Sequence, residues 1–178
     1  MIRGEACNLR AVERTDAHFV RDLLNDPSVR AGWGTSGVPI SIHRVEADIE
    51  SWIEIERATR YPASLIIESL DGSALGIVVI QLPEKFLATL SIAIEPLSQR
   101  HGFGRDALVT LIEALFDEWR VHRIEMSCEA DNPGAAELYL ALGFTREAVR
   151  RGVTFTAGEW RDQHHFGLLA TDPRPWLT

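Results

Sequence analysis

The sequence has few of the features that mark membrane and secreted proteins. No apolar run approaches the roughly 20 residues that a membrane-spanning helix needs. The first residues, Met1 to Glu5, lack the apolar core of a signal peptide. We therefore expect a soluble, cytoplasmic protein that does not associate with membranes.

Cysteine and lysine are also scarce. Cys7 and Cys128 are the only cysteines, and they show no metal-ligand spacing, so buried thiols are favoured over a disulfide or a zinc site. No metal site is predicted. Lys85 is the only lysine among 18 basic residues. The net charge of −8 argues against general affinity for nucleic acid and slightly favours a cationic substrate such as an amine.

The length and the hydrophobic content of the chain suffice for one compact domain. A chain of 178 residues with 46% hydrophobic content can bury a real core but is too short for two ordinary domains. We expect the domain to span residues 1–171 and a C-terminal tail to occupy residues 172–178.

Hydrophobic patterning predicts strands interleaved with helices, which argues for an α+β or α/β fold with a mixed sheet. Strands are expected near residues 8–11, 63–69, 74–82, 86–95, 123–128, 144–149 and 163–169. Asp71-Gly72 predicts a hairpin between the second and third strands, and a polar stretch with a turn near Ala157-Gly158 joins the last two. Helices are expected at 15–25, capped by Thr15 or Asp16 and ended by Pro27, at 42–58, and in the two stretches described next.

The loop after the strand at 86–95 is the best candidate for a binding site. Gln99-Arg100-His101-Gly102-Phe103-Gly104 precedes a long amphipathic helix that extends to about Trp119. The glycines let consecutive N–H groups converge without Cβ interference, and the helix N-terminus adds partial positive charge, so the loop predicts a phosphate cradle. A side chain at Gly104 is expected to crowd a pyrophosphate or to force an unfavourable φ. A turn that needs glycine for geometry alone is the alternative.

The spacing of this loop excludes the commoner nucleotide-binding motifs. A Walker loop has four residues between its glycines, followed by Gly-Lys-Ser/Thr. The dinucleotide fingerprint has a third glycine three residues on, where Ala107 stands. Neither ATP nor NAD is favoured.

Residues 30–39 form the best candidate for a substrate loop. Three glycines and a proline in so short a stretch exclude regular structure, yet Trp33 lies in its middle. Trp33 either lines a substrate site or only packs against the core and so fixes the loop to it.

Two motifs resemble those of the GNAT superfamily of acetyl-CoA-dependent N-acetyltransferases. The first is Gln99-x-x-Gly102-x-Gly104, and the second is Asn132-x-x-Ala135-Ala136-x-Leu138-Tyr139-x-x-Leu142-Gly143-Phe144. Their occurrence in the right order is more specific than either alone. The resemblance, which extends from Leu9 to Leu169, implies a GNAT fold: a single α+β domain with a mixed central sheet and helices on both faces. Arg150 or Arg151, Gly158, Asp162 and residues 166–169 are similar to the branch that contains ribosomal-protein alanine acetyltransferases and many small-molecule and antibiotic acetyltransferases.

The resemblance implies roles in binding CoA for two segments. The pyrophosphate would be held largely through main-chain N–H groups of Gln99, Arg100, His101, Gly102, Phe103, Gly104 and Arg105. The pantetheine arm would pair with the main chain of Ile92, Ala93 and Ile94, and the Ile92 N–H would be the oxyanion donor. Asn132, in one motif with Ala135, would bond that arm or its neighbouring strand, although a role as helix N-cap before Pro133 explains Asn132 equally well.

Tyr139 matches the general acid of the family, which protonates the departing CoA thiolate. An ordinary phenol has a pKa of about 10 and a thiol about 8.5, so this transfer is plausible in the transition state. Packing of the helix against the sheet is the alternative role. The carboxylate base frequent in the family is missing, since Ala88 and Thr89 occupy its place and Glu95 lies beyond the oxyanion donor. A water relay, or an amine that arrives partly deprotonated, fits this departure.

The sequence thus predicts an N-acetyltransferase that uses acetyl-CoA to acetylate a primary amine directly. The acceptor would be a small amine, an antibiotic or a protein N-terminus. The alternative is a catalytically silent CoA-binding module of GNAT-like fold that regulates or scaffolds a partner. Dimerisation through the C-terminal strands is common in such proteins, so a homodimer is possible.

Overall fold

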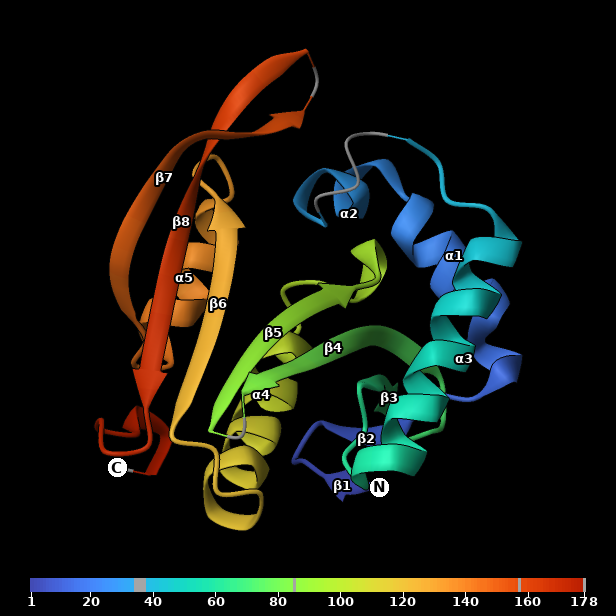
Figure 1. Ribbon diagram of the computed structural model, residues 1–178, viewed down its shortest axis with the longest axis horizontal. Helices are drawn as coiled ribbons and strands as arrows, with labels where there is room; N and C mark the ends of the chain where they lie inside the picture. The colour runs from blue at the N-terminus through green and yellow to red at the C-terminus, as the bar shows by residue number, and fades with distance from the viewer. Residues whose placement is uncertain (34–37, 85, 157, 178) are drawn as a thin grey trace.

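The protein, described by a computed structural model over residues 1–33, 38–84, 86–156 and 158–177, is built on one eight-stranded sheet. The strand order is β1-β2-β3-β4-β5-β6-β8-β7 (Figure 1). The strands are β1 (Ile2–Arg3), β2 (Cys7–Ala11), β3 (Ser64–Ser69), β4 (Ala74–Glu84), β5 (Leu87–Ile94), β6 (Arg123–Glu129), β7 (Thr145–Thr156) and β8 (Glu159–Leu169). The α-helices are α1 (Ala17–Asn25), α2 (Pro27–Gly32), α3 (Ile42–Thr59), α4 (Phe103–Glu113) and α5 (Pro133–Ala141).

The sheet is mixed, because one of its strand pairs is parallel. Neighbouring strands run antiparallel except β5 and β6, whose parallel pairing extends from Leu87 opposite Arg123 to Leu90 opposite Met126. Beyond these residues β5 pairs only with β4 and β6 only with β8. The two strands therefore diverge toward their carboxyl ends, as Figure 1 shows.

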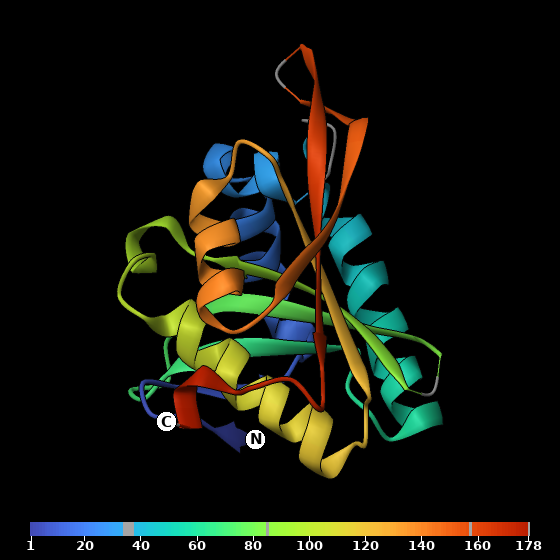
Figure 2. The same ribbon diagram turned by 90° about the vertical axis from the view of Figure 1, so that its left-hand side faces the viewer.

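Helices cover both faces of the sheet and form two separate cores. Leu108 and Leu111 of α4 pack with Met126 of β6 in the first core, which Tyr139 of α5 also joins. The second core joins α1 and α3 to the opposite face of β3 and β4. Figure 2 shows α4 and α5 on one side of the strands and α3 on the other. The predicted α+β fold, a mixed sheet with helices on both faces, is confirmed.

Local sequence signals set the ends of the two helices that follow β5 and β6. The helix after the glycine loop runs through α4 and a π-helical turn to Glu118, close to the expected end at Trp119. The side chain of Asn132 accepts a hydrogen bond from the Ala135 N–H (3.1 Å), and Pro133 is the first residue of α5. Gly143, with a φ of 82°, ends that helix as expected.

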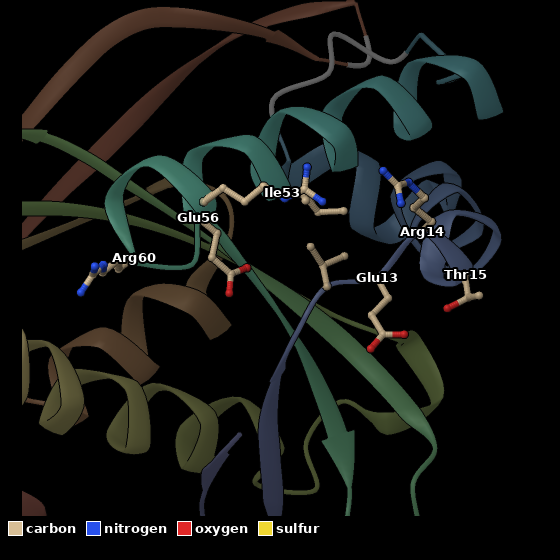
Figure 3. A pocket seen from close by; sticks show the side chains of 8 residues that line it. Glu13, Arg14, Thr15, Ile53, Glu56 and Arg60 are labelled. Carbon is tan, nitrogen blue, oxygen red and sulfur yellow. The ribbon is translucent and has the colours of Figure 1, made fainter.

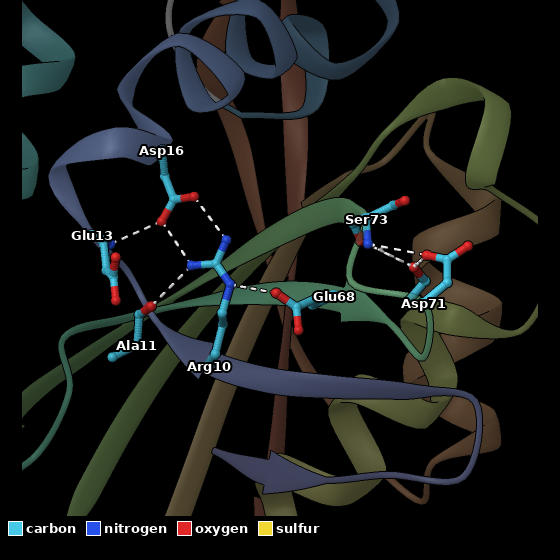
Figure 4. A network of polar contacts seen from close by, with 8 residues as sticks. Arg10, Ala11, Glu13, Asp16, Glu68, Asp71 and Ser73 are labelled. Atoms are coloured by element: carbon cyan, nitrogen blue, oxygen red, sulfur yellow. Dashed lines mark hydrogen bonds and ion pairs between the residues drawn. The ribbon is translucent and has the colours of Figure 1, made fainter.

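The start of α1 differs in detail from the prediction. A 3₁₀ turn over Arg14–Asp16 precedes the helix, and Asp16 is the N-cap residue without capping through its side chain. Its carboxylate instead accepts two hydrogen bonds from Arg10 (2.8 Å each) and one from the Glu13 N–H (2.8 Å), while Arg10 also bonds Glu68 (2.6 Å; Figure 4). Burial opposes ionisation of Asp16, but Arg10 and the Glu13 N–H hold its pKa below the usual range. This network ties α1 to β2 and β3.

The prediction of irregular structure over residues 30–39 was wrong at its beginning. Pro27 ends α1 but also serves as the first residue of α2, whose N-cap Asp26 accepts a hydrogen bond from the Ser28 N–H. A proline fits the first turn of a helix because its missing N–H would have no helical partner there. Residues 30–32 are therefore helical, and residues 34–37 lie outside the described part of the chain.

The expected bounds of the last two strands were too short, because β7 extends to Thr156 and β8 begins at Glu159. The strands turn where the sequence predicts, at Gly158. They form a long hairpin that projects beyond the rest of the sheet (Figures 1 and 2). β7 is an edge strand, mostly exposed on both faces, and its register shifts between Arg146 and Ala148 and between Arg150 and Thr154. Both properties remove the alternation that predicts a strand. Ala157 of the expected turn lies outside the described residues, as does Lys85 of the turn after β4.

The expected tail packs against the domain. Arg174 donates two hydrogen bonds to Asp117 (2.7 and 2.8 Å), and the Trp176 indole donates to Glu113 (3.0 Å). Within the described residues, no helix is long and apolar enough to cross a membrane.

Candidate active site

The divergence of β5 and β6 opens a cavity of about 300 Å³. Residues of α2, the two strands, α5 and the β7–β8 hairpin surround it. The predicted site residues that line it are Trp33, Ile92, Ala93, Ile94, Gln99, Asn132, Ala135 and Tyr139. The fold therefore brings the predicted acceptor, pantetheine and acid positions together at one opening.

The main chain of β5 offers hydrogen-bonding groups to this opening. Alternate residues of an antiparallel strand direct their N–H and C=O groups to opposite neighbours. The Glu95 N–H donates to Leu75 of β4 (2.8 Å), so Ala93 also faces β4, whereas Ile92 and Ile94 face the β6 side. Because pairing with β6 ends at Leu90, the Ile92 N–H is directed into the gap. This is the orientation that an oxyanion donor requires.

The glycine loop lies at one end of the gap. The Gln99 side chain, which lines the cavity, donates a hydrogen bond to the Ile94 carbonyl (3.0 Å). Gly102 is the N-cap of α4 with a φ of 88°, and the first helical bond runs from the Asp106 N–H to the Gly102 carbonyl (3.0 Å). The N–H groups of the first turn have no helical acceptor there, and no side chain within the described part of the chain caps them. The loop thus fits an anionic group such as a pyrophosphate.

The two glycines of the loop have different physical requirements. Gly102 needs its left-handed conformation, whereas Gly104 has no positive φ, so the expectation of backbone strain at Gly104 was wrong. A Cβ placed at Gly104 would be 3.7 Å from Ile94 and 3.8 Å from Leu138, which is ordinary contact. A methyl group at Gly104 would therefore fit without displacing its neighbours.

The other residues of the loop are open to solvent or packed beside it. Arg100, with a φ of 62°, His101 and Arg105 are exposed, and the rings of His101 and Phe103 lie 6.4 Å apart. Phe103 packs against the first core. These residues do not line the cavity itself, so their role in holding a pyrophosphate stays a prediction.

A carboxylate in the first turn of α4 holds the loop in place. Burial opposes ionisation of Asp106, but the N–H groups of Glu5, Ala6 and Cys7 (3.1, 2.9 and 2.9 Å) hold its pKa below the usual range. The Cys7 thiol also contacts Asp106 (3.3 Å), and burial together with this carboxylate raises the pKa of Cys7 to about 12. The N-terminal strands are thereby tied to the start of α4.

Tyr139 is buried between the cavity and the core. It is 5% exposed, and its ring packs edge-on against Phe166 (5.3 Å) and tilted against Phe144 (6.0 Å). Burial, followed by the proximity of Cys128, raises the pKa of Tyr139. The phenol therefore stays protonated at neutral pH, as a general acid must, and the same contacts also serve packing.

Asn132 and Trp33 each fit both roles that the sequence left open. The Asn132 side-chain oxygen caps α5, yet the residue lines the cavity. Trp33 is the C-cap residue of α2, lines the cavity and packs against the second core.

Sequence reasoning missed several polar residues on the β6 and hairpin side of the cavity. These are Ser127, Glu129, Thr154 and Gln163. Cys128 lies among them, and burial, with Glu129 next, raises the pKa of its thiol to about 11. Both cysteines are buried and free, as predicted, and the described residues hold no cluster of His, Cys, Asp and Glu suited to a metal.

A larger hollow of about 740 Å³ lies elsewhere, between α3 and the residues before α1 (Figure 3). None of the predicted site residues lines it. In Figure 3 the charged ends of Glu13 and Arg14 point in opposite directions, and Arg14 is already paired with Glu50. Its polar groups do not converge, so the smaller cavity is the better candidate for chemistry.

Comparisons with known proteins agree with this fold. Spermidine N(1)-acetyltransferase of Vibrio cholerae is 24% identical over 170 residues, which are 90% of this chain and 91% of that protein. A crystal structure of spermidine N-acetyltransferase from Vibrio cholerae in complex with CoA and spermine matches with a TM-score of 0.84 and 23% identity, covering 97% of this chain and 99% of that one. A GNAT-family acetyltransferase from Bacillus anthracis matches with a TM-score of 0.81 and 16% identity, covering 95% and 98%.

The family model for the acetyltransferase (GNAT) domain matches residues 7–145, which include both motifs. The relatives named above do not point to the ribosomal-protein branch suggested by the C-terminal residues. The family model nevertheless covers most of the chain. This protein therefore belongs to the GNAT acetyltransferase family.

Proposed function

We propose that this protein transfers the acetyl group of acetyl-CoA directly to a primary amine. The observation that carries the proposal is the convergence of the Ile92 N–H and the buried Tyr139 on one cavity. The N-terminus of α4 lies beside that cavity, and Gly104 in its first turn has no side chain to keep a phosphate from the main chain. CoA is also the ligand named for the Vibrio cholerae enzyme of similar fold.

In this proposal the chain contributes position and electrostatics to the transfer. The main chain of Ile92, Ala93 and Ile94 aligns the pantetheine arm, and the N-terminus of α4 holds the pyrophosphate. The Ile92 N–H donates to the carbonyl oxygen of the thioester as negative charge develops on it. As the C–N bond forms and the C–S bond breaks, Tyr139 donates its proton to the departing sulfur. The proton lost by the amine nitrogen leaves through a water relay, after which Tyr139 is reprotonated. No covalent enzyme intermediate is needed, because the cavity holds thioester and amine together.

The proposed acceptor is a small amine. The Vibrio cholerae relative is a spermidine N-acetyltransferase, and the net charge of −8 favours a cationic acceptor. Antibiotics and protein N-termini are the other acceptors to test. We also propose that the chain assembles into a homodimer. One Vibrio cholerae structure of similar fold is described as dodecameric.

The decisive experiment measures thiol release from acetyl-CoA with spermidine, an aminoglycoside and a peptide with an N-terminal alanine. We expect release that depends on one of these amines and matches the amount of acetylated product. The proposed reaction would be overturned if calorimetry showed that CoA binds but none of the amines caused thiol release from acetyl-CoA. That result would instead support the silent CoA-binding module.

A further inference from the structure

Glu129 is a buried acidic residue at the carboxyl end of β6, beside the gap. It is 6% exposed and lines the cavity together with Ile92 and Tyr139. Extending the pairing of Leu90 with Met126 along both strands places Glu129 across the gap from Ala93, one residue beyond the proposed oxyanion donor. A carboxylate at this place is close to the point where an acceptor amine must arrive.

The surroundings of Glu129 offer its carboxylate one hydrogen-bond partner. The Thr156 hydroxyl of β7 donates a hydrogen bond to Glu129 Oε1 (2.9 Å). No other hydrogen bond and no ion pair to this side chain exists among the described residues, although a carboxylate offers about four acceptor positions. Burying a carboxylate with one neutral partner is costly, and a cation in the cavity would offset that cost.

Glu129 lies on the face of the sheet opposite Tyr139. Successive side chains of a strand alternate between faces, and Cys128 packs in the first core with Tyr139. Glu129 and Ser127 therefore face the side of the sheet that carries α1, α2 and α3. There the cavity is bounded by Ser28 and Trp33 of the α2 region and by Thr154 of the hairpin. This face of the sheet is opposite the face that carries α4, where the CoA phosphates are proposed to bind.

We propose that the Glu129 carboxylate binds the positively charged group of the acceptor, and that the Thr156 hydroxyl holds this carboxylate in position. The inference rests on the proposed acetyl transfer and adds the class of acceptor: an alkylamine with a cationic group, in preference to an amine with an anionic one. Glu129 acts as a specificity-determining residue, and Thr156 is a positioning residue.

The test uses three acceptors with the same reacting amine and different tails. These are 1,4-diaminobutane, butylamine and 4-aminobutanoate, whose tails are cationic, neutral and anionic. We expect kcat/KM to fall in that order for the wild type. Glu129→Gln should lower the ratio of kcat/KM for diaminobutane to that for aminobutanoate by roughly 10-fold or more, the scale of one lost charged hydrogen bond. The KM for acetyl-CoA should stay unchanged.

Three further variants separate this role from general electrostatics and from folding. Glu159→Gln removes the same charge from an exposed position of the hairpin outside the cavity, so the ratio should stay at the wild-type value. Thr156→Val should lower the ratio by a few-fold and Thr156→Ser should restore it. Because a partly unfolded enzyme loses activity toward every acceptor alike, the ratio isolates the charge. An unchanged ratio in Glu129→Gln, or an equal loss in Glu159→Gln, would overturn the proposal.

Binding without turnover distinguishes this inference from the proposed reaction. Calorimetry should show diaminobutane binding to the CoA-saturated wild type more tightly than to Glu129→Gln. Absence of that difference overturns the role of Glu129 even if acetyl transfer is found. Presence of the difference without thiol release overturns the proposed reaction and leaves the cation site standing.

Discussion

The two sides of the gap between β5 and β6 are built from different kinds of groups. On the α4 side, the groups available to a ligand are main-chain N–H groups of Ile92 and of the turn around Gly102. On the α2 side, the groups are side chains, among them Trp33, Glu129 and Thr154. Main-chain groups keep their positions when side chains change, whereas each side chain can be replaced separately. We infer that the donor site is set by the fold and that acceptor selection is set by a few substitutable residues.

Tyr139 lies on the α4 side, but its proposed role depends on both sides, because a proton donor to sulfur acts only once donor and acceptor are in place. Tyr139→Phe keeps the ring contacts with Phe144 and Phe166 and removes the hydroxyl. We expect kcat to fall by roughly 10²-fold or more, with little change in either KM or in Tm. Steady-state kinetics under conditions where chemistry limits the rate checks this. A wild-type kcat in the Phe variant would leave Tyr139 a packing residue.

The direction of the Tyr139 pKa shift also predicts the pH profile. Burial, and then nearby Cys128, raise the pKa of Tyr139, so the acid form persists to higher pH than in free tyrosine. Loss of activity through Tyr139 ionisation should therefore begin above the ordinary value of about 10. A fall in kcat near pH 8 that disappears in Tyr139→Phe would contradict this environment.

Gly104 tests the donor side alone. A Cβ there meets only ordinary contacts, and alanine is favoured over glycine within a helix by about 1 kcal/mol, so Gly104→Ala should raise or preserve stability. In contrast, CoA affinity should fall by roughly 10-fold as the methyl group meets the phosphates. Gly104→Val should have a larger effect in the same direction. Calorimetric CoA binding and thermal unfolding measure the two changes.

Two neighbours serve as controls for Gly104. Gly102→Ala has open space around its Cβ but must hold a φ of 88°, so it should lose stability. Arg100→Ala removes an exposed charge and should weaken CoA binding less than Gly104→Val does. Unchanged CoA affinity in Gly104→Val would show that the glycine loop does not bind the pyrophosphate.

The same contrast explains what the sequence predicted and what it did not. The glycine turn and the start of α5 were predicted because their signals are local: Gly102 supplies a positive φ, and Asn132 and Pro133 stand next to each other at the start of the helix. Glu129 was missed because its partner Thr156 lies 27 residues away, in a strand whose exposed edge shows no alternation. No local pattern marks a carboxylate that becomes buried only when a distant hairpin folds over it.

The start of α2 shows a second reason for failure. Pro27 was interpreted as the end of a helix, which is correct for α1, but the same residue begins α2. Proline excludes continuation of the preceding helix and favours the first turn of the next, so one residue carries two opposite local meanings. Both meanings are realised here, and the short helix that results is held to the second core through Trp33.

Trp33 tests the acceptor side alone and has the smallest expected effect. We expect Trp33→Ala to raise the acceptor KM by roughly 3- to 10-fold, the equivalent of one aromatic contact, with the acetyl-CoA KM unchanged. Trp52 of α3 is a matched control, because it is also half-buried and packs against the second core but does not line the cavity. Both alanine variants should lose stability, measured as Tm, yet only Trp33→Ala should change the acceptor KM. Equal acceptor KM values in the two variants, with similar losses of Tm, would show that Trp33 only fastens α2 to the core.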